Sequence, residues 1–221
     1  MPNQPNYLAP ARFIDSDAPI VTAFAREATQ RAVGEIDRIV RLYRAVRDGI
    51  TYDPYVDFND PQVYLASSVL AAGRGYCVGK GAVLAACARS LGIPARLGFA
   101  DVRNHMTSAK LYAMFKTDIF IWHCYVDLAI DGKWVKATPI FDARLCEKLH
   151  LAPLDFDGHN DSLFQPYDSA GRRRMEYLRD HDTFADVPVE TILAAFRATY
   201  PASALQQKIK GDFAAEAIAG S

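Results

Sequence analysis

The spacing of hydrophobic residues predicts that helices form the first part of the chain. Apolar positions recur at intervals of three and four over residues 19–28 and again over residues 36–46, which is the period of an amphipathic helix. Two more helices are predicted over residues 61–72 and 77–91, the second ending at a glycine and a proline. Residues 1–18 are polar and proline-containing, so we expect an extended lead-in.

The middle of the chain alternates between apolar and polar residues, which is the period of a strand. One strand is predicted over residues 95–102 and another over 118–130, where every even position from 120 is apolar. The other face of this second strand carries His123, Tyr125 and Asp127.

A tight turn follows the second strand. Asp131-Gly132 is a strong two-residue hairpin signal, so residues 133–138 are predicted to return antiparallel to it. Counting outward from the turn places Thr138 close to the position opposite His123.

The last third of the chain is predicted to be helical and rich in loops. We expect a short helix over residues 142–150, a long loop over 151–171, and helices over 172–179 and 189–200. Residues 201–221 are rich in alanine and either dock as a helix or fray.

Helices followed by a small antiparallel sheet indicate an α+β fold. We expect a single domain over residues 1–221, with its core at about 45–142, the lead-in at 1–18 and an extension at 150–221.

Composition and charge narrow the classes of function. The 221 residues carry 25 basic and 26 acidic side chains, so no net field favours nucleic acid or an anionic membrane. No segment reaches the roughly 20 apolar residues of a membrane span, and the first residues lack the pattern of a signal peptide, so we expect a cytoplasmic protein. Its four cysteines then read as thiols, and because no CxxC pair occurs, neither a metal site nor a cofactor is expected.

Cys77 is the first candidate for chemistry. Cys77 follows the glycine-containing residues 73–76 and is the first residue of the predicted helix. At a helix N-terminus the helix dipole and unpaired N–H groups favour the thiolate. The alternative is a small packed thiol, because free cysteine is among the most buried residue types.

His123 is the second candidate. The chain between Cys77 and His123 is long enough to finish a helix, run one strand and return beside it. A strand histidine is more often structural, but the polar neighbours on its face favour a cleft. His105, beside Asn104 at the end of a strand, is a rival base or a substrate contact, whereas His150, His159 and His181 are expected at the surface.

Two segments resemble the transglutaminase-like superfamily. Gly75-Tyr76-Cys77, continuing to residue 96, resembles its cysteine helix, and His123-Cys124-Tyr125-Val126-Asp127 with Asp131-Gly132-Lys133-Trp134-Val135 resembles its histidine hairpin. The resemblance covers about residues 45–142 and implies a papain-like core with a Cys-His-Asp triad. Members of the family include cysteine peptidases and amidases, amide cross-linking acyltransferases and some cyclases.

The chain departs from the family pattern at the third triad position. The family has an Asp-Pro pair where this chain has Thr138-Pro139. Either the Thr138 hydroxyl orients His123, or Asp142 reaches back to it, and we favour Asp142. Asp127 fits less well, because it shares a strand and a face with His123.

The sequence therefore predicts thiol-dependent acyl transfer or hydrolysis at an amide or thioester. Cys77 would be the nucleophile and His123 the base, with Tyr76, Asn104, His105 and Tyr125 as possible cleft contacts. The expected partner is a peptide, protein or small acyl substrate. The alternative is a non-catalytic binding module that keeps the fold with a degraded triad.

Overall fold

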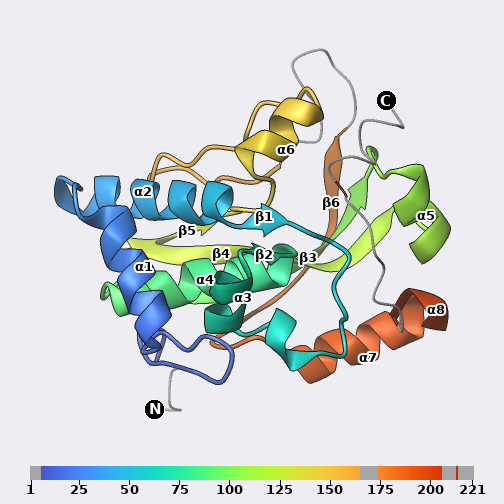
Figure 1. The fold of residues 1–221 in the computed structure, drawn as a ribbon, viewed down its shortest axis with the longest axis horizontal. Coiled ribbons are helices and arrows are strands. Elements are labelled where there is room, and N and C mark those ends of the chain that lie inside the picture. The colour runs from blue at the N-terminus through green and yellow to red at the C-terminus, as the bar shows by residue number, and fades with distance from the viewer. Residues whose placement is uncertain (1–5, 165–173, 206–212, 214–221) are drawn as a thin grey trace.

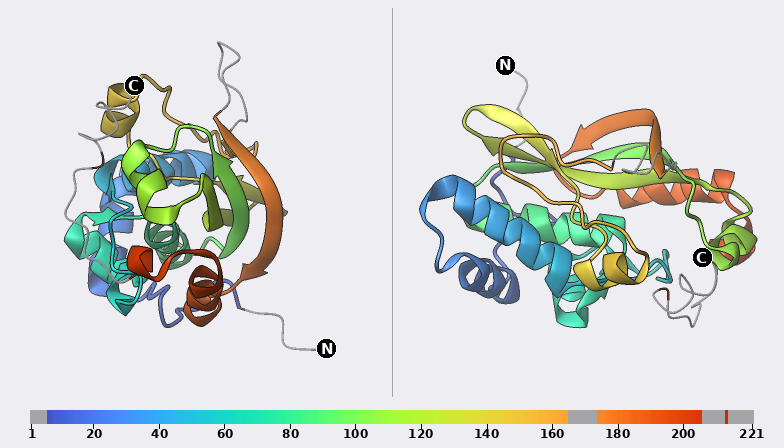
Figure 2. Two further views of the ribbon diagram at one scale, coloured as in Figure 1. Left: turned by 90° about the vertical axis from the view of Figure 1, so that its right-hand side faces the viewer. Right: turned by 90° about the horizontal axis from the view of Figure 1, so that it is seen from above.

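In the computed structural model, which describes residues 6–164, 174–205 and 213, helices cover one face of a four-stranded antiparallel sheet (Figure 1). The right-hand view of Figure 2 shows the N-terminal helices on one side and the sheet on the other. The architecture is α+β, as predicted.

The central helix is α4 (Cys77–Ser90), against which α1 (Pro19–Thr29), α2 (Gly34–Gly49) and α3 (Ala66–Ala72) pack. Every residue from Cys77 to Arg89 is buried, so this helix is enclosed on all sides, unlike its amphipathic neighbours.

The sheet has the order β5-β4-β3-β6. Its strands are β3 (Ala95–Asn104), β4 (Ile119–Ile130), β5 (Lys133–Ala137) and β6 (Met175–Phe184). Helix α4 lies across β4, where a Cβ added to Gly81 would come within 2.6 Å of the Cys124 sulfur. Glycine at this position therefore lets the helix approach the strand closely.

Short elements complete the fold around one end of α4. β1 (Thr51–Tyr52) pairs in parallel with β2 (Arg74–Gly75), immediately before Cys77. The remaining helices are η1 (Pro61–Val63), α5 (Ala109–Phe115), α6 (Ala143–Lys148), α7 (Val189–Thr199) and α8 (Ala202–Leu205).

Most of the predicted elements are confirmed. The two first helices, the helix from Cys77, the strands on both sides of the hairpin and the turn itself all occur, with Asp131 and Gly132 at φ 49° and 76°. The helices predicted over residues 142–150 and 189–200 correspond to α6 and α7. Residues 165–173 of the predicted loop and most of the predicted C-terminal helix lie outside the described residues.

Three expectations need correction, and one helix was not predicted. The helix predicted over residues 172–179 is wrong, because residues 175–184 form the edge strand β6. The helix predicted over residues 61–72 is split into η1 and α3, and α5 was not predicted. β5 ends at Ala137, which pairs with Val126, so Thr138 follows the strand instead of pairing with His123.

No helix in the described part of the chain is long and apolar enough to cross a membrane.

Candidate active site

Cys77 is the first residue of α4, at the rim of a pocket. Gly73, with a left-handed φ of 63°, ends α3, so the chain turns back to enter α4 after only three more residues. The sulfur faces the backbone N–H groups of Cys77, Val78 and Cys124, and the residue is 9% exposed.

The pocket has a volume of about 70 Å³, and both Cys77 and His123 line it. The two leading candidates from the sequence are thus brought to one cavity, one from a helix N-terminus and the other from a strand. The cavity lies where α4 and β4 meet residues of α5 and α7.

His123 reaches this pocket because a bulge interrupts β4 just before it. Ala100 pairs with His123 whereas Val102 pairs with Phe120, so two residues of β4 lie opposite one residue of β3. Trp122, inside the bulge, has a left-handed φ of 57°, which is rare for a bulky residue. Successive side chains of a regular strand point to opposite faces, yet Trp122 and His123 both line the pocket.

Asp101 and His181 hold the bulge in place. One oxygen of Asp101 accepts the Trp122 N–H at 3.1 Å and also lies 2.7 Å from His181 Nε2. The His181 ring stacks on the Trp122 indole, with centroids 4.4 Å apart and planes at 11°. His181 is therefore not at the surface as expected: its side chain is 12% exposed, and it supports the backbone next to His123.

Hydroxyl groups and aromatic rings surround His123. The rings of Phe164 and Tyr177 lie 6.1 and 6.4 Å from the imidazole. Within the described residues, His123 Nε2 is enclosed without a hydrogen-bond partner, as are the Thr138 and Tyr177 hydroxyls. The Thr138 hydroxyl acts to lower the pKa of Tyr177 against the larger effect of burial, so the two hydroxyls are neighbours.

Asp142 makes a different set of contacts. Its Oδ1 accepts the Leu145 N–H at 3.0 Å and thereby caps α6, and its Oδ2 accepts the Tyr52 N–H at 3.0 Å. No hydrogen bond joins Asp142 or Thr138 to His123 in the described part of the structure. The carboxylate thus links α6 to β1.

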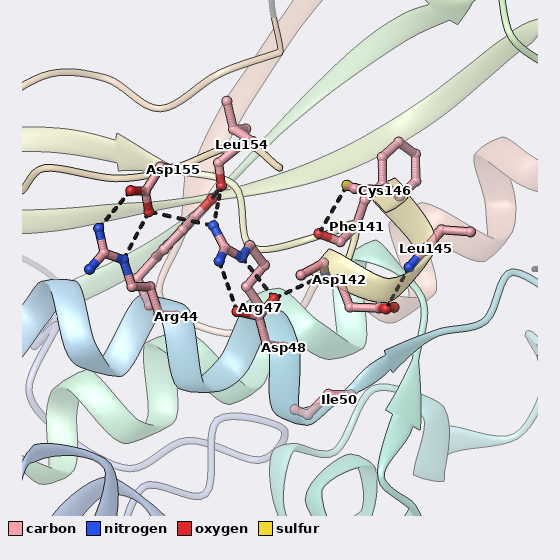
Figure 3. Close-up of polar contacts among 12 residues, drawn as sticks. Arg44, Arg47, Asp48, Ile50, Phe141, Asp142, Leu145, Cys146, Leu154 and Asp155 are labelled. Atoms are coloured by element: carbon pink, nitrogen blue, oxygen red, sulfur yellow. Dashed lines mark hydrogen bonds and ion pairs between the residues drawn. The ribbon is translucent and has the colours of Figure 1, made fainter. Parts of the chain in front are cut away.

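Lys80, one turn into α4 from Cys77, has a fully buried side chain. Its Nζ donates to the carbonyl oxygens of Arg47 at 2.8 Å and Ile50 at 2.5 Å, at the end of α2. Figure 3 shows how this end of α2 is also joined to α6, because Asp48 pairs with Arg47 and accepts the Ala143 N–H. In the same figure Arg44 and Arg47 reach Asp155 in the segment after α6.

Burial determines the protonation states of the two candidate residues. It raises the pKa of Cys77 to about 11, although the N–H groups around the sulfur act in the opposite direction. Burial also lowers the pKa of His123 to about 4. The expected thiolate is therefore not the resting form: the pair is a neutral thiol and a neutral imidazole.

The other predicted contacts divide into two groups. Tyr76 and Asn104 line the pocket beside Cys77. Tyr125 faces a separate depression, where its hydroxyl bonds Asp180 at 3.0 Å, and His105 lies 3.4 Å from Glu176 outside the pocket. The structure thus does not bring Tyr125 or His105 to the site.

Three features of this site were not predicted: the bulge at Trp122, its support by Asp101 and His181, and the buried Lys80. Only Lys80 left a signal, as one of two basic residues, with Arg89, within the apolar helix 77–91.

Known structures with a similar arrangement include a candidate cysteine protease from Cytophaga hutchinsonii, at 16% identity and a TM-score of 0.46, over 80% of this chain and 52% of that one. A structure described as a TGase has 19% identity and a TM-score of 0.44, over 60% of this chain and 33% of the other. This chain thus spans about half, or less, of the length of these proteins. A search of curated proteins found no match.

A family model also matches the chain. The model of the transglutaminase-like superfamily matches residues 22–139, which is more than half of the 221 residues, from α1 through the hairpin to Pro139. The chain belongs to the transglutaminase-like superfamily.

Proposed function

We propose that the protein is a cysteine-dependent enzyme that transfers or hydrolyses the acyl group of an amide or thioester. The observation that carries this proposal is that Cys77, at the start of α4, and His123, on the bulged strand, line one pocket. A nucleophile and a base supplied by separate rigid elements is the arrangement that covalent acyl transfer requires.

The neutral resting pair determines the first step. His123 removes the thiol proton as the sulfur attacks the carbonyl carbon, so the thiolate forms only as the new S–C bond forms. The N–H groups of Cys77 and Cys124, which face the sulfur, are placed to donate to the oxyanion. His123 then protonates the leaving amine or thiol, and the acyl group remains on Cys77.

The second step depends on the acceptor. His123 activates water for hydrolysis, an amine for cross-linking or a substrate carbon nucleophile for cyclisation. The acceptor that reacts in this step and the group that the pocket holds together determine whether the substrate is a peptide, a protein or a small acyl compound.

We assign the orienting role behind His123 to Thr138 instead of Asp142. Both Asp142 oxygens are occupied by backbone N–H groups, and burial is the cause that shifts the pKa of His123. A carboxylate bonded to the imidazole would raise that pKa. The Tyr177 ring lies 6.4 Å from the imidazole, and within the described residues the Tyr177 hydroxyl and the neighbouring Thr138 hydroxyl are enclosed without a hydrogen-bond partner.

Selective alkylation tests the proposal. Intact protein is treated with iodoacetamide and the four cysteines are followed by peptide mass spectrometry. Cys77 is expected to react before Cys87, Cys124 and Cys146, which do not line the pocket, and His123→Ala is expected to slow its reaction. Equal, slow labelling of all four thiols would refute the proposal.

The second candidate is a non-catalytic binding module. The raised pKa of Cys77 and the absence of a carboxylate hydrogen-bonded to His123 in the described residues favour it. A binding module would not form an acyl adduct on Cys77 with any thioester, whereas an enzyme would. Intact-protein mass spectrometry distinguishes the two.

A further inference from the structure

Among the described residues, the wall of the pocket beside Cys77 carries no charged side chain. Ten of its eighteen residues are Phe, Tyr or Trp, and the polar ones besides tyrosine are Cys77, Asn104 and His123. A pocket this apolar within reach of a nucleophile indicates the character of the group that it holds.

The aromatic wall is a packed cluster drawn from distant parts of the chain. Phe58 meets Phe196 of α7 edge-to-face at 5.3 Å, and Phe115 of α5 meets Phe120 at 5.6 Å and Tyr200 at 4.8 Å. Such contacts restrict the rings, so the shape of the pocket is largely preformed.

The polar ends of two of the three tyrosines in this wall, Tyr200 and Tyr76, are turned away or enclosed. The Tyr200 hydroxyl donates to the Ile119 carbonyl at 3.3 Å and accepts the Ile121 N–H at 2.8 Å. The Tyr76 hydroxyl is enclosed near Tyr64. These residues therefore present ring surface to the cavity.

Apart from the tyrosines, Cys77 and His123, the polar residue that lines the pocket is Asn104. Its Oδ1 accepts the Met106 N–H at 3.0 Å, which fixes the orientation of the amide. The amide carries no charge, so it cannot balance an anion or a cation in the pocket.

The composition of this wall determines which chemical groups bind favourably in the pocket. A carboxylate or ammonium group entering the pocket would lose its hydration without gaining an ionic partner, and burying even an uncharged polar group without a hydrogen bond is unfavourable. Burying an apolar group is favourable in proportion to the apolar area that it removes from water.

The volume of the pocket limits the size of the group that it can hold. At about 70 Å³ the pocket is smaller than the engineered cavities of about 150 Å³ that hold benzene. A short aliphatic chain fits, whereas a phenyl ring requires side chains to move.

We propose that this pocket is an acyl-binding subsite for a short, uncharged, aliphatic acyl group, whose carbonyl carbon Cys77 attacks. The inference rests on the proposed function. In the acylation step the Cys77 sulfur bonds to the carbonyl carbon, the bond from that carbon to the substrate thiol breaks, and the Cys77 proton passes through His123 to the departing sulfur.

A matched pair of thioesters tests the subsite. Butyryl and succinyl thioesters of one small thiol have four-carbon acyl groups that differ in a terminal methyl or carboxylate. Acylation of Cys77 by each is followed by intact-protein mass spectrometry, with Cys77→Ala to identify the site. Butyryl transfer is expected to be at least tenfold faster than succinyl transfer, and faster than phenylacetyl transfer.

A charge placed in the wall should reverse the preference. Phe120, half-buried in the wall, is changed to lysine, and Tyr112→Lys, on the exposed face of α5 outside the pocket, is the matched control. Phe120→Lys is expected to lower the butyryl-to-succinyl ratio at least tenfold, while Tyr112→Lys leaves the ratio unchanged. The wild-type ratio decides the matter if Phe120→Lys does not fold.

The two proposals fail in different ways. Equal rates, or faster succinyl transfer, in the wild-type protein would overturn the apolar subsite while leaving the nucleophile in place. No adduct on Cys77 with any thioester, together with equal alkylation of all four cysteines, would overturn the proposed function and the subsite with it.

Discussion

Two side chains at the site, Cys77 and His123, are both held in their neutral forms by burial. The N–H groups at the start of α4 favour the thiolate, but the loss of solvation around the sulfur is the larger effect. A helix N-terminus therefore does not by itself create a thiolate when the thiol is enclosed.

The reaction of Cys77 with iodoacetamide should accordingly depend strongly on pH. Because the pKa of the thiol is raised to about 11, the thiolate fraction, and with it the rate, should rise about tenfold for each pH unit between 7 and 10. A thiolate–imidazolium pair would instead give a plateau through neutral pH. Rates measured by mass spectrometry from pH 6 to 10 distinguish the two, with Cys77→Ala as the control.

The identity of the residue behind His123 can be tested with two conservative changes. Thr138→Val keeps the shape of the side chain but removes the hydroxyl, and we expect acylation of Cys77 to slow about five- to tenfold, the size of one hydrogen bond that the hydroxyl would accept from the imidazolium formed during the reaction. Asp142→Asn keeps the acceptor that caps α6, so its effect on the rate should be less than twofold. A large effect of Asp142→Asn together with none from Thr138→Val would restore Asp142 as the third residue.

At the scale of the elements, β4 brings His123 to Cys77 through an irregularity that its sequence does not reveal. Alternation correctly predicts the buried face of Cys124, Val126, Leu128 and Ile130, and the hairpin turn. It does not predict a left-handed tryptophan, because bulky residues have no preference for that conformation. The bulge depends on tertiary contacts from β3 and β6, which a local pattern cannot contain.

The strand β6 was not predicted for the same reason, because a local sequence pattern does not contain tertiary contacts. Residues 175–184 carry many charged side chains and no clean alternation, so the sequence favoured a helix over part of this segment. An edge strand is stabilised mainly by its hydrogen bonds to β3, which local propensity does not report.

We expect Asp101 to affect the rate of Cys77 acylation by positioning His123. Asp101→Ala removes the acceptor of the Trp122 N–H and leaves a partly buried donor unpaired, which costs about 1–3 kcal/mol of stability. With the bulge released, acylation of Cys77 should also slow when measured where the variant is still fully folded. Asp118→Ala, which removes an exposed carboxylate next to β4, is the matched control.

A double-mutant cycle separates positioning from general destabilisation. If Asp101 acts through His123, then Asp101→Ala should have little further effect on the acylation rate in a His123→Ala background. Full additivity of the two changes in activation free energy would contradict the positioning role.

On the scale of the whole molecule, Lys80 connects the site to the fold. It lies on the same helix as Cys77, three residues further on, and its amino group donates to the carbonyls of Arg47 and Ile50 at the end of α2. Asp142 and Asp48 lie close enough to act on its pKa, and Asp142 in turn holds Tyr52 at the pocket. The start of α4, the end of α2 and the start of α6 are therefore joined around one buried lysine.

This arrangement makes stability depend on pH in a definite direction. Burial lowers the pKa of Lys80 to about 7, while Asp142 and Asp48 act to raise it, and the unfolded chain has a value near 10.5. Between these two values the unfolded state holds a proton that the folded state lacks, so the contribution of Lys80 to the free energy of unfolding rises with pH. The rise is about 1.4 kcal/mol per pH unit within that window and stops above it.

Lys80→Met isolates this contribution, because methionine retains much of the aliphatic length without the titratable group. The free energy of unfolding of the wild type minus that of Lys80→Met should become more positive from pH 7 to pH 10, as measured by urea denaturation at each pH. Groups common to both proteins cancel in this difference, and Lys133→Met, which removes an exposed lysine charge from β5, is the control. A difference that stays constant, or falls, over this range would mean that Lys80 keeps its proton in the folded protein, and the three elements would then be joined by an ammonium ion instead of a neutral amine.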